Sequence, residues 1–136
     1  MFQYKKIVTE LLEENTYILH NEDKECIIID PGYGFKLIDS FILLNNLKPL
    51  AILATHAHID HIASASDFID KYNIDLYLCE NERLIVENFH RAVNYWGMGD
   101  TIKRPNVSHW IKVDQKNLQP LSASITFDSL RESNYS

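Results

Sequence analysis

The order of apolar and polar positions predicts alternating strands and helices along most of the chain. A β-branched and aromatic run at 15–20 and an apolar run at 25–29 flank the polar residues 21–24, a pattern typical of a hairpin. After its first residue the second run is apolar throughout, which favours a strand covered on both faces. A weaker alternation at 2–12 predicts a further strand before this hairpin. Asp30-Pro31-Gly32 predicts a turn, because proline cannot continue a strand ladder.

The middle of the chain continues this alternation with longer segments. Apolar residues at helical spacing predict a helix within 34–47, and the apolar run 50–54 predicts a buried strand. A helical period then predicts a helix from about Asp60 to Tyr72, and residues 74–79 read as another strand. A last helix is predicted from Asn81, its expected cap, to Trp96. Strands that alternate with helices indicate an α/β layered fold.

Length and composition restrict the class of protein. The chain has 136 residues, 46% of them hydrophobic and 24% charged, as expected for one globular domain. No apolar run approaches the roughly 20 residues of a membrane span, and the first residues lack the apolar region of a signal peptide. We therefore expect a cytoplasmic protein with no membrane partner. The net charge of −6 argues against nucleic-acid binding by basic side chains, although it leaves room for a phosphate held by metal ions.

The two cysteines indicate structural thiols. Cys26 and Cys79 each lie within an apolar run. Free cysteine is among the most buried residue types, and disulfides are rare in cytoplasmic proteins. We therefore expect buried thiols and no bridge between them.

Metal-ligand side chains are concentrated in Thr55-His56-Ala57-His58-Ile59-Asp60-His61, directly behind the apolar run at 50–54. Side chains two residues apart in an extended strand point to the same face, so His56 and His58 can converge on one ion. Asp60 and His61 fall where the strand gives way to a helix, and this bend could direct them at a second ion. On the residues alone, a group of surface histidines near an aspartate remains the alternative.

The motif His56-x-His58-x-Asp60-His61 after a buried strand resembles the metal loop of the metallo-β-lactamase superfamily. The segment 15–19 resembles the family's early strand with its asparagine, and 27–32 resembles the strand and turn before its first helix. The order and separation of these segments resemble the glyoxalase II-like branch of small thioester hydrolases, the hydroxyacylglutathione hydrolase-like proteins, more than the β-lactamases. The resemblance extends from about Val8 to Met98.

The resemblance implies a role for each matching residue. His56 and His58 would bind a first metal ion, Asp60 and His61 a second, and Asp30 would brace the metal loop from behind. Nitrogen and oxygen ligands suit Zn²⁺, and iron or manganese would also accept them. Two ions about 3.5–4 Å apart can activate a bridging water to hydroxide. Asp60 would also orient this nucleophile by accepting its proton.

The second half of the family pattern has no match in this sequence. The family supplies there a third histidine in a Gly-His-Thr-Pro-Gly-like turn, a metal-bridging aspartate and a last histidine. Only His90 and His109 remain downstream, and neither matches the expected turn, so we expect ordinary polar or packing roles for both. Asp100 and Asp114 resemble the bridging aspartate by residue type alone.

The resemblance implies a four-layer αββα sandwich, of which we expect only the first half. Residues 1–113 are predicted to form this part of the domain, and 114–136 a serine-rich, irregular and partly disordered tail. A chain of this kind would expose one face of an apolar sheet. These features motivate the hypothesis that the chain is a truncated or frame-shifted product whose natural sequence ends near Val113. The downstream nucleotide sequence, read in the other two frames, tests this hypothesis.

Three functions are compatible with these observations. The favoured one is a metal-dependent hydrolase that uses a metal-activated hydroxide on a thioester such as an acylglutathione. A phosphodiesterase or nuclease built on the same loop is the second, although the acidic balance counts against it. The third is a non-catalytic metal-binding fragment, which the missing downstream ligands favour.

Overall fold

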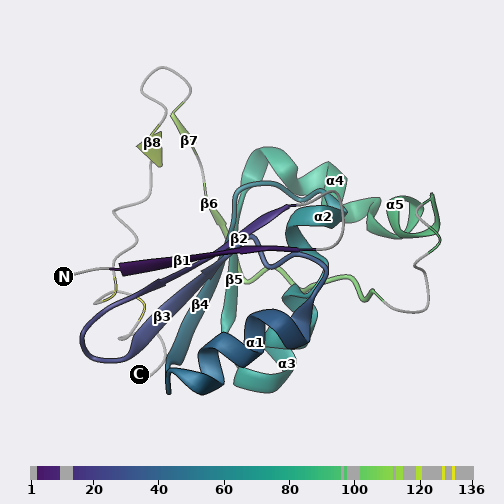
Figure 1. Ribbon diagram of the computed structural model, residues 1–136. Coiled ribbons are helices and arrows are strands. Elements are labelled where there is room, and N and C mark those ends of the chain that lie inside the picture. Colours follow the sequence, from purple (N-terminus) through teal and green to yellow (C-terminus); the bar gives the residue numbers. More distant parts are fainter. Residues whose placement is uncertain are drawn as a thin grey trace.

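Six strands form one twisted sheet in the computed structural model (Figure 1). In spatial order they are β1 (Gln3–Val8), β2 (Asn15–His20), β3 (Glu25–Ile29), β4 (Lys48–Ala54), β5 (Asp75–Cys79) and β6 (His109–Ile111). The first three strands pair antiparallel, and β3 to β6 pair parallel. Two short strands, β7 (Val113–Asp114) and β8 (Gln119–Pro120), pair separately. The structure describes residues 3–9, 14–95, 97, 102–111, 113–114, 119–120, 127 and 130, without the side chains of 59, 60, 113, 114, 119 and 120.

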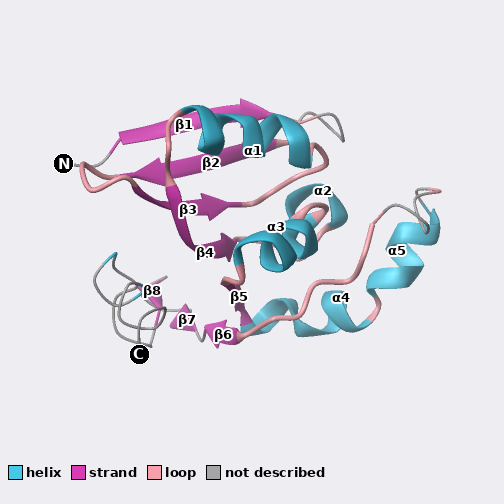
Figure 2. Ribbon diagram, turned by 90° about the horizontal axis from the view of Figure 1, so that it is seen from below, coloured by secondary structure: helices cyan, strands magenta, loops and turns pink. Residues whose placement is uncertain are grey.

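Helices connect the parallel strands and cover one face of the sheet (Figure 2). They are α1 (Phe35–Leu44), α2 (Ile59–Ile62), α3 (Ala65–Tyr72), the 3-10 helix η2 (Glu80–Glu82), α4 (Arg83–Glu87) and α5 (Phe89–Tyr95). Among the described residues, none of these helices has the length and apolar character needed to cross a membrane. The predicted α/β layering is confirmed.

Two long helices predicted from the sequence are each broken in the structure. The helix expected from Asp60 to Tyr72 is interrupted between α2 and α3, where the N–H of Ser64 donates to the carbonyl of Pro31 (3.1 Å). The helix expected from Asn81 is divided into η2, α4 and α5, and Asn81 lies inside η2 instead of acting as a cap. The interruption after α4 falls at Asn88, whose backbone and side chain both donate to the carbonyl of Leu84.

Apolar side chains are buried on both faces of the sheet. The face toward the helices includes Ile28, Ile52 and Leu76, which are completely buried. On the other face lies a second apolar cluster, which we call the outer cluster: Ile27, Leu50, Ala51, Phe127 and Leu130. The expected exposed sheet face is therefore wrong for these strand residues, which are buried in one cluster with two residues of the predicted tail. The irregular character of 114–136 stays a prediction, since most of that segment lies outside the described residues.

Cys26 is expected to resist alkylation in the folded protein. Its side chain is fully buried, and this burial raises the pKa of the thiol to about 12. Because the thiolate is the reactive form, a protonated and inaccessible thiol reacts slowly. Brief treatment with iodoacetamide followed by peptide mass spectrometry should label the half-buried Cys79 before Cys26. Equal labelling of the two thiols without denaturant would contradict this packing.

A buried carboxylate joins α1 to α3. Asp39, only 5% exposed, accepts hydrogen bonds from the Lys71 ammonium and the Tyr72 hydroxyl. Burial, together with the bond to Asp39, raises the pKa of the Tyr72 hydroxyl. Asp39→Ala should lower the free energy of unfolding by about 2–4 kcal/mol, because both donors lose their acceptor. Urea denaturation measures this loss.

Asp70→Ala is the matched control for this experiment. Asp70 pairs with Lys103 at 3.3 Å, but both side chains are mostly exposed. An exposed pair contributes less than about 1 kcal/mol. A similar loss of stability in both variants would show that Asp39 makes no special contribution.

Candidate metal centre

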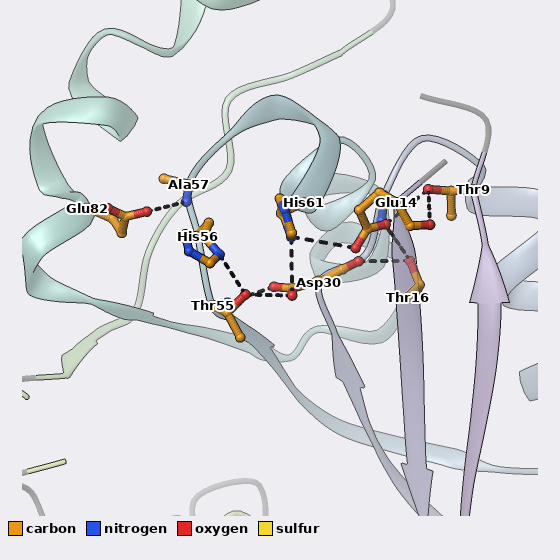
Figure 3. Close-up of polar contacts among 10 residues, drawn as sticks. Thr9, Glu14, Thr16, Asp30, Thr55, His56, Ala57, His61 and Glu82 are labelled. Carbon is orange, nitrogen blue, oxygen red and sulfur yellow. Dashed lines mark hydrogen bonds and ion pairs between the residues drawn. The ribbon is translucent and has the colours of Figure 1, made fainter. Parts of the chain in front are cut away.

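The predicted metal loop follows the carboxyl end of β4, between the ends of its two neighbours in the sheet (Figure 3). His56 and His58 are exposed, and Ala57 between them is buried. The ring centres of these histidines are 6.0 Å apart. The ring of His61, on α2, lies 5.1 Å from that of His56. The structure thus gathers three of the predicted ligands at one end of the sheet.

These separations fit imidazoles that share a metal centre. Imidazole nitrogens bind zinc at about 2.0–2.1 Å, which places the centres of two rings on one ion roughly 5–6 Å apart. Both measured separations fall close to this range. The donors are nitrogen atoms on exposed or partly exposed rings, so a metal ion can reach them from solvent.

Asp30 contacts the loop from the adjacent strand end. Its backbone has a φ of 53°, a left-handed conformation that aspartate tolerates better than most residues. Its carboxylate accepts the N–H of Thr55 at Oδ1 and the hydroxyl of Thr55 at Oδ2, both at 2.6 Å. Oδ2 also lies 3.2 Å from Nδ1 of His61. The structure therefore brings Asp30 to the place where the sequence predicts a brace.

Glu82 contacts the same loop from the other neighbouring strand. Its Oε1 accepts the N–H of Ala57 at 3.1 Å, two residues beyond the N–H held by Asp30 (Figure 3). Glu82 belongs to η2, directly after β5. Sequence reasoning missed this residue, because only the parallel pairing of β4 with β5 brings the two segments together.

Glu14 is a second acidic residue that sequence reasoning missed. Its side chain is buried, and its Oε2 accepts hydrogen bonds from the hydroxyls of Thr9 (3.0 Å) and Thr16 (3.1 Å). Its Oε1 lies 3.6 Å from Nδ1 of His61 and accepts no hydrogen bond from the described residues. Burial raises the pKa of this carboxyl to about 7, although the two hydroxyls oppose the shift. The sequence around Glu14 carries no metal-ligand motif that would have marked this residue.

Glu14, Asp30 and His61 offer ligand atoms that all lie within 4.8 Å of one another. This spacing would allow the three to hold a cation directly. Alternatively, the two carboxylates can bind a proton on Nδ1 of His61 and leave the other ring nitrogen for a metal, as outer carboxylates do for many metal-binding histidines. Either arrangement makes this end of the sheet a candidate metal centre.

The other candidate residues lie elsewhere or are not described. Asp60 belongs to α2, but its side chain is outside the described set.

The two downstream histidines lie outside the metal loop. His90 is exposed on α5, and His109 on β6 contacts Asp75 (2.9 Å) and stacks on the ring of Tyr77. Asp100 lies outside the described residues, as does the side chain of Asp114. The roles assigned to all of these residues stay predictions.

Comparisons with known proteins identify relatives of this chain. The family model described as the metallo-beta-lactamase superfamily matches residues 10–122. The probable metallo-hydrolase YqgX of Bacillus subtilis is 37% identical over 81 residues, which cover 60% of this chain and 38% of that protein. The hydroxyacylglutathione hydrolase of Buchnera aphidicola subsp. Baizongia pistaciae is 43% identical over 75 residues, which cover 54% of this chain and 30% of that enzyme.

A solved structure supports the same fold. The BLEG-1 B3 metallo-beta-lactamase superimposes with a TM-score of 0.69 at 32% identity, covering 79% of this chain and 52% of that one. The chain spans about a third of the length of the curated relatives just described. The family model matches most of the sequence, and the structure of this chain has the fold of the superimposed metallo-β-lactamase. The chain therefore belongs to the metallo-β-lactamase superfamily.

Proposed function

We propose that this chain is a metal-dependent hydrolase of the glyoxalase II-like type, which acts on a thioester such as an acylglutathione. One observation carries the proposal: the rings of His56 and His58, on the loop at the end of a buried parallel strand, gather with the ring of His61 on the helix that follows. The surface-histidine alternative gives no reason for two carboxylates to hold the backbone of that loop, as Asp30 and Glu82 do.

The proposed ligands are His56, His58, Asp60 and His61, and the proposed metal is Zn²⁺, with iron or manganese as alternatives. The donor set fits such ions, since imidazole nitrogen and carboxylate oxygen are their usual protein ligands. A bound ion of this kind lowers the pKa of a coordinated water toward about 7 and polarises the bond to be cleaved.

The chain's own residues would orient the reacting groups. Asp60, on the first turn after the loop, would accept the proton of the attacking water. Asp30 and Glu82 hold the loop through the N–H groups of Thr55 and Ala57, so the histidine side chains keep their direction. Glu14 places a second carboxylate beside His61.

The relatives support a thioester as the substrate class, without excluding others. The Buchnera relative is named a hydroxyacylglutathione hydrolase, which is a thioester hydrolase. BLEG-1 is named a β-lactamase, so a β-lactam is the competing small-molecule substrate. The net charge of −6 counts against a nucleic-acid substrate.

A substrate panel tests the proposal. The purified chain, loaded with Zn²⁺ and assayed for metal content, is given S-lactoylglutathione, nitrocefin and bis-p-nitrophenyl phosphate. We expect turnover of the thioester to exceed that of the other two substrates. Faster cleavage of the phosphodiester or the β-lactam would overturn the substrate class.

A non-catalytic metal-binding role is the second candidate. It is favoured by the contacts of His109, which engage Asp75 and Tyr77 instead of the metal loop. Stoichiometric metal with no turnover of any substrate in the panel would establish this role in place of hydrolysis.

A further inference from the structure

We propose that the hydroxyl of Thr55 is a positioning group, which fixes the ring nitrogen of His56 that carries the proton. The inference rests on the proposed function, because it concerns the atom that His56 offers to a metal. Thr55 lies between Asp30 and His56 (Figure 3). Its Oγ1 is 2.6 Å from Oδ2 of Asp30 and 3.0 Å from Nδ1 of His56.

The direction of these hydrogen bonds follows from a count of protons. A threonine hydroxyl carries one proton, and an ionised carboxylate can only accept. The proton of Thr55 therefore lies on its bond to Asp30. The contact with His56 then needs a proton from the ring, so the Nδ1–H of His56 donates to Oγ1 of Thr55.

A neutral imidazole has a single N–H, so this arrangement leaves Nε2 of His56 with a free lone pair. Nε2 is then the only nitrogen of this ring that can bind a metal. Without the hydroxyl, Nδ1 of His56 would have no hydrogen-bond acceptor among the described residues. Both tautomers of the ring would then be populated. Only a fraction of the molecules would then present the correct nitrogen.

The carboxylate of Asp30 keeps the hydroxyl in place. It holds Thr55 at two points, the backbone N–H and the hydroxyl, and bonds to a charged acceptor are stronger than neutral ones. Rotation of the hydroxyl toward His56 would break the bond to Oδ2. Asp30 also lies beside Nδ1 of His61, so this carboxylate faces that ring directly and acts on His56 through Thr55.

Thr55→Val and Thr55→Ser separate the hydroxyl from the rest of the side chain. Valine keeps the shape and the backbone N–H that Asp30 binds, whereas serine keeps the hydroxyl. Long-range ¹H–¹⁵N NMR of histidine-labelled protein at pH 8, without added metal, reports the tautomer of His56. We expect protonated Nδ1 in the wild type and in Thr55→Ser, and a mixture of tautomers in Thr55→Val.

A zinc titration gives a second measurement on the same samples. Loss of an outer hydrogen-bond partner typically lowers metal affinity about 10- to 100-fold. We expect a loss of this size in Thr55→Val and the wild-type affinity in Thr55→Ser. Circular dichroism confirms that each variant is folded.

Three results would overturn the proposal. One is a wild-type His56 protonated at Nε2, which needs no variant to observe. Another is a Thr55→Val protein with the wild-type tautomer and affinity, and the third is a Thr55→Ser protein that behaves like Thr55→Val. None of these depends on hydrolysis, so a wild-type chain without turnover would reject the proposed function and leave this result standing.

Discussion

His58→Ala is expected to abolish tight metal binding and to lower thioester turnover by more than about 100-fold, since even outer partners of a metal site cost about 10- to 100-fold. His58 is exposed, and its ring centre lies 6.0 Å from that of His56. Loss of the ring removes a ligand without opening a cavity in the core. Metal content by mass spectrometry and steady-state hydrolysis of S-lactoylglutathione measure the two effects.

His90→Ala is the matched control, because His90 is also an exposed histidine but lies on α5. It should keep the metal content and turnover of the wild type. Asp60→Ala extends the comparison to a residue of the matched motif whose side chain the structure does not describe, and it should lose far more turnover than His90→Ala. Comparable losses in the His58 and His90 variants would reject the assignment of the loop as the metal site.

Leu130→Ala should lower the free energy of unfolding by about 3 kcal/mol, as expected for truncation of a buried leucine. Leu130 is 2% exposed and packs with Phe127 against Ile27, Leu50 and Ala51 in the outer cluster. Truncation would leave a cavity over the sheet face that lies opposite the helices. Urea denaturation monitored by circular dichroism measures the loss.

Leu44→Ala provides the control for this substitution, because Leu44 is 82% exposed at the end of α1. Its truncation removes almost no buried surface, so the unfolding midpoint should stay within error of the wild type. If Leu130→Ala behaves in the same way, residues 127 and 130 do not cover the sheet in solution, and a disordered tail becomes the better description.

The regular part of the fold could be predicted from the sequence because its signals are local. The hairpin of β2 and β3 follows from two β-branched runs around a polar turn, and the structure places both strands at the predicted residues. The interruption at Ser64 could not be predicted this way, because it depends on the carbonyl of Pro31, more than thirty residues earlier. Strand β6 is only three residues long and is defined by its pairing with β5.

Some residues of the candidate site could also be predicted from the local sequence, and others could not. The three histidines lie within six residues of one another, at the end of a strand and the start of the next helix, so the sequence alone indicates that they are close in space. Glu14 and Glu82 are far from that loop in the sequence and reach it only through the order of strands in the sheet. A single sequence gives no means to distinguish them from the chain's other acidic residues.

The two carboxylates that hold the N–H groups of Thr55 and Ala57 affect the thermodynamics of metal uptake. In small zinc domains the ligands come together only when the ion binds, so the ordering of the chain reduces the observed affinity. Here the backbone of the loop is fixed by bonds that involve no metal. The loop is therefore preorganised. The entropic cost of ordering it belongs to the folding of the chain and not to metal binding, so each ligand contributes more of its intrinsic binding free energy.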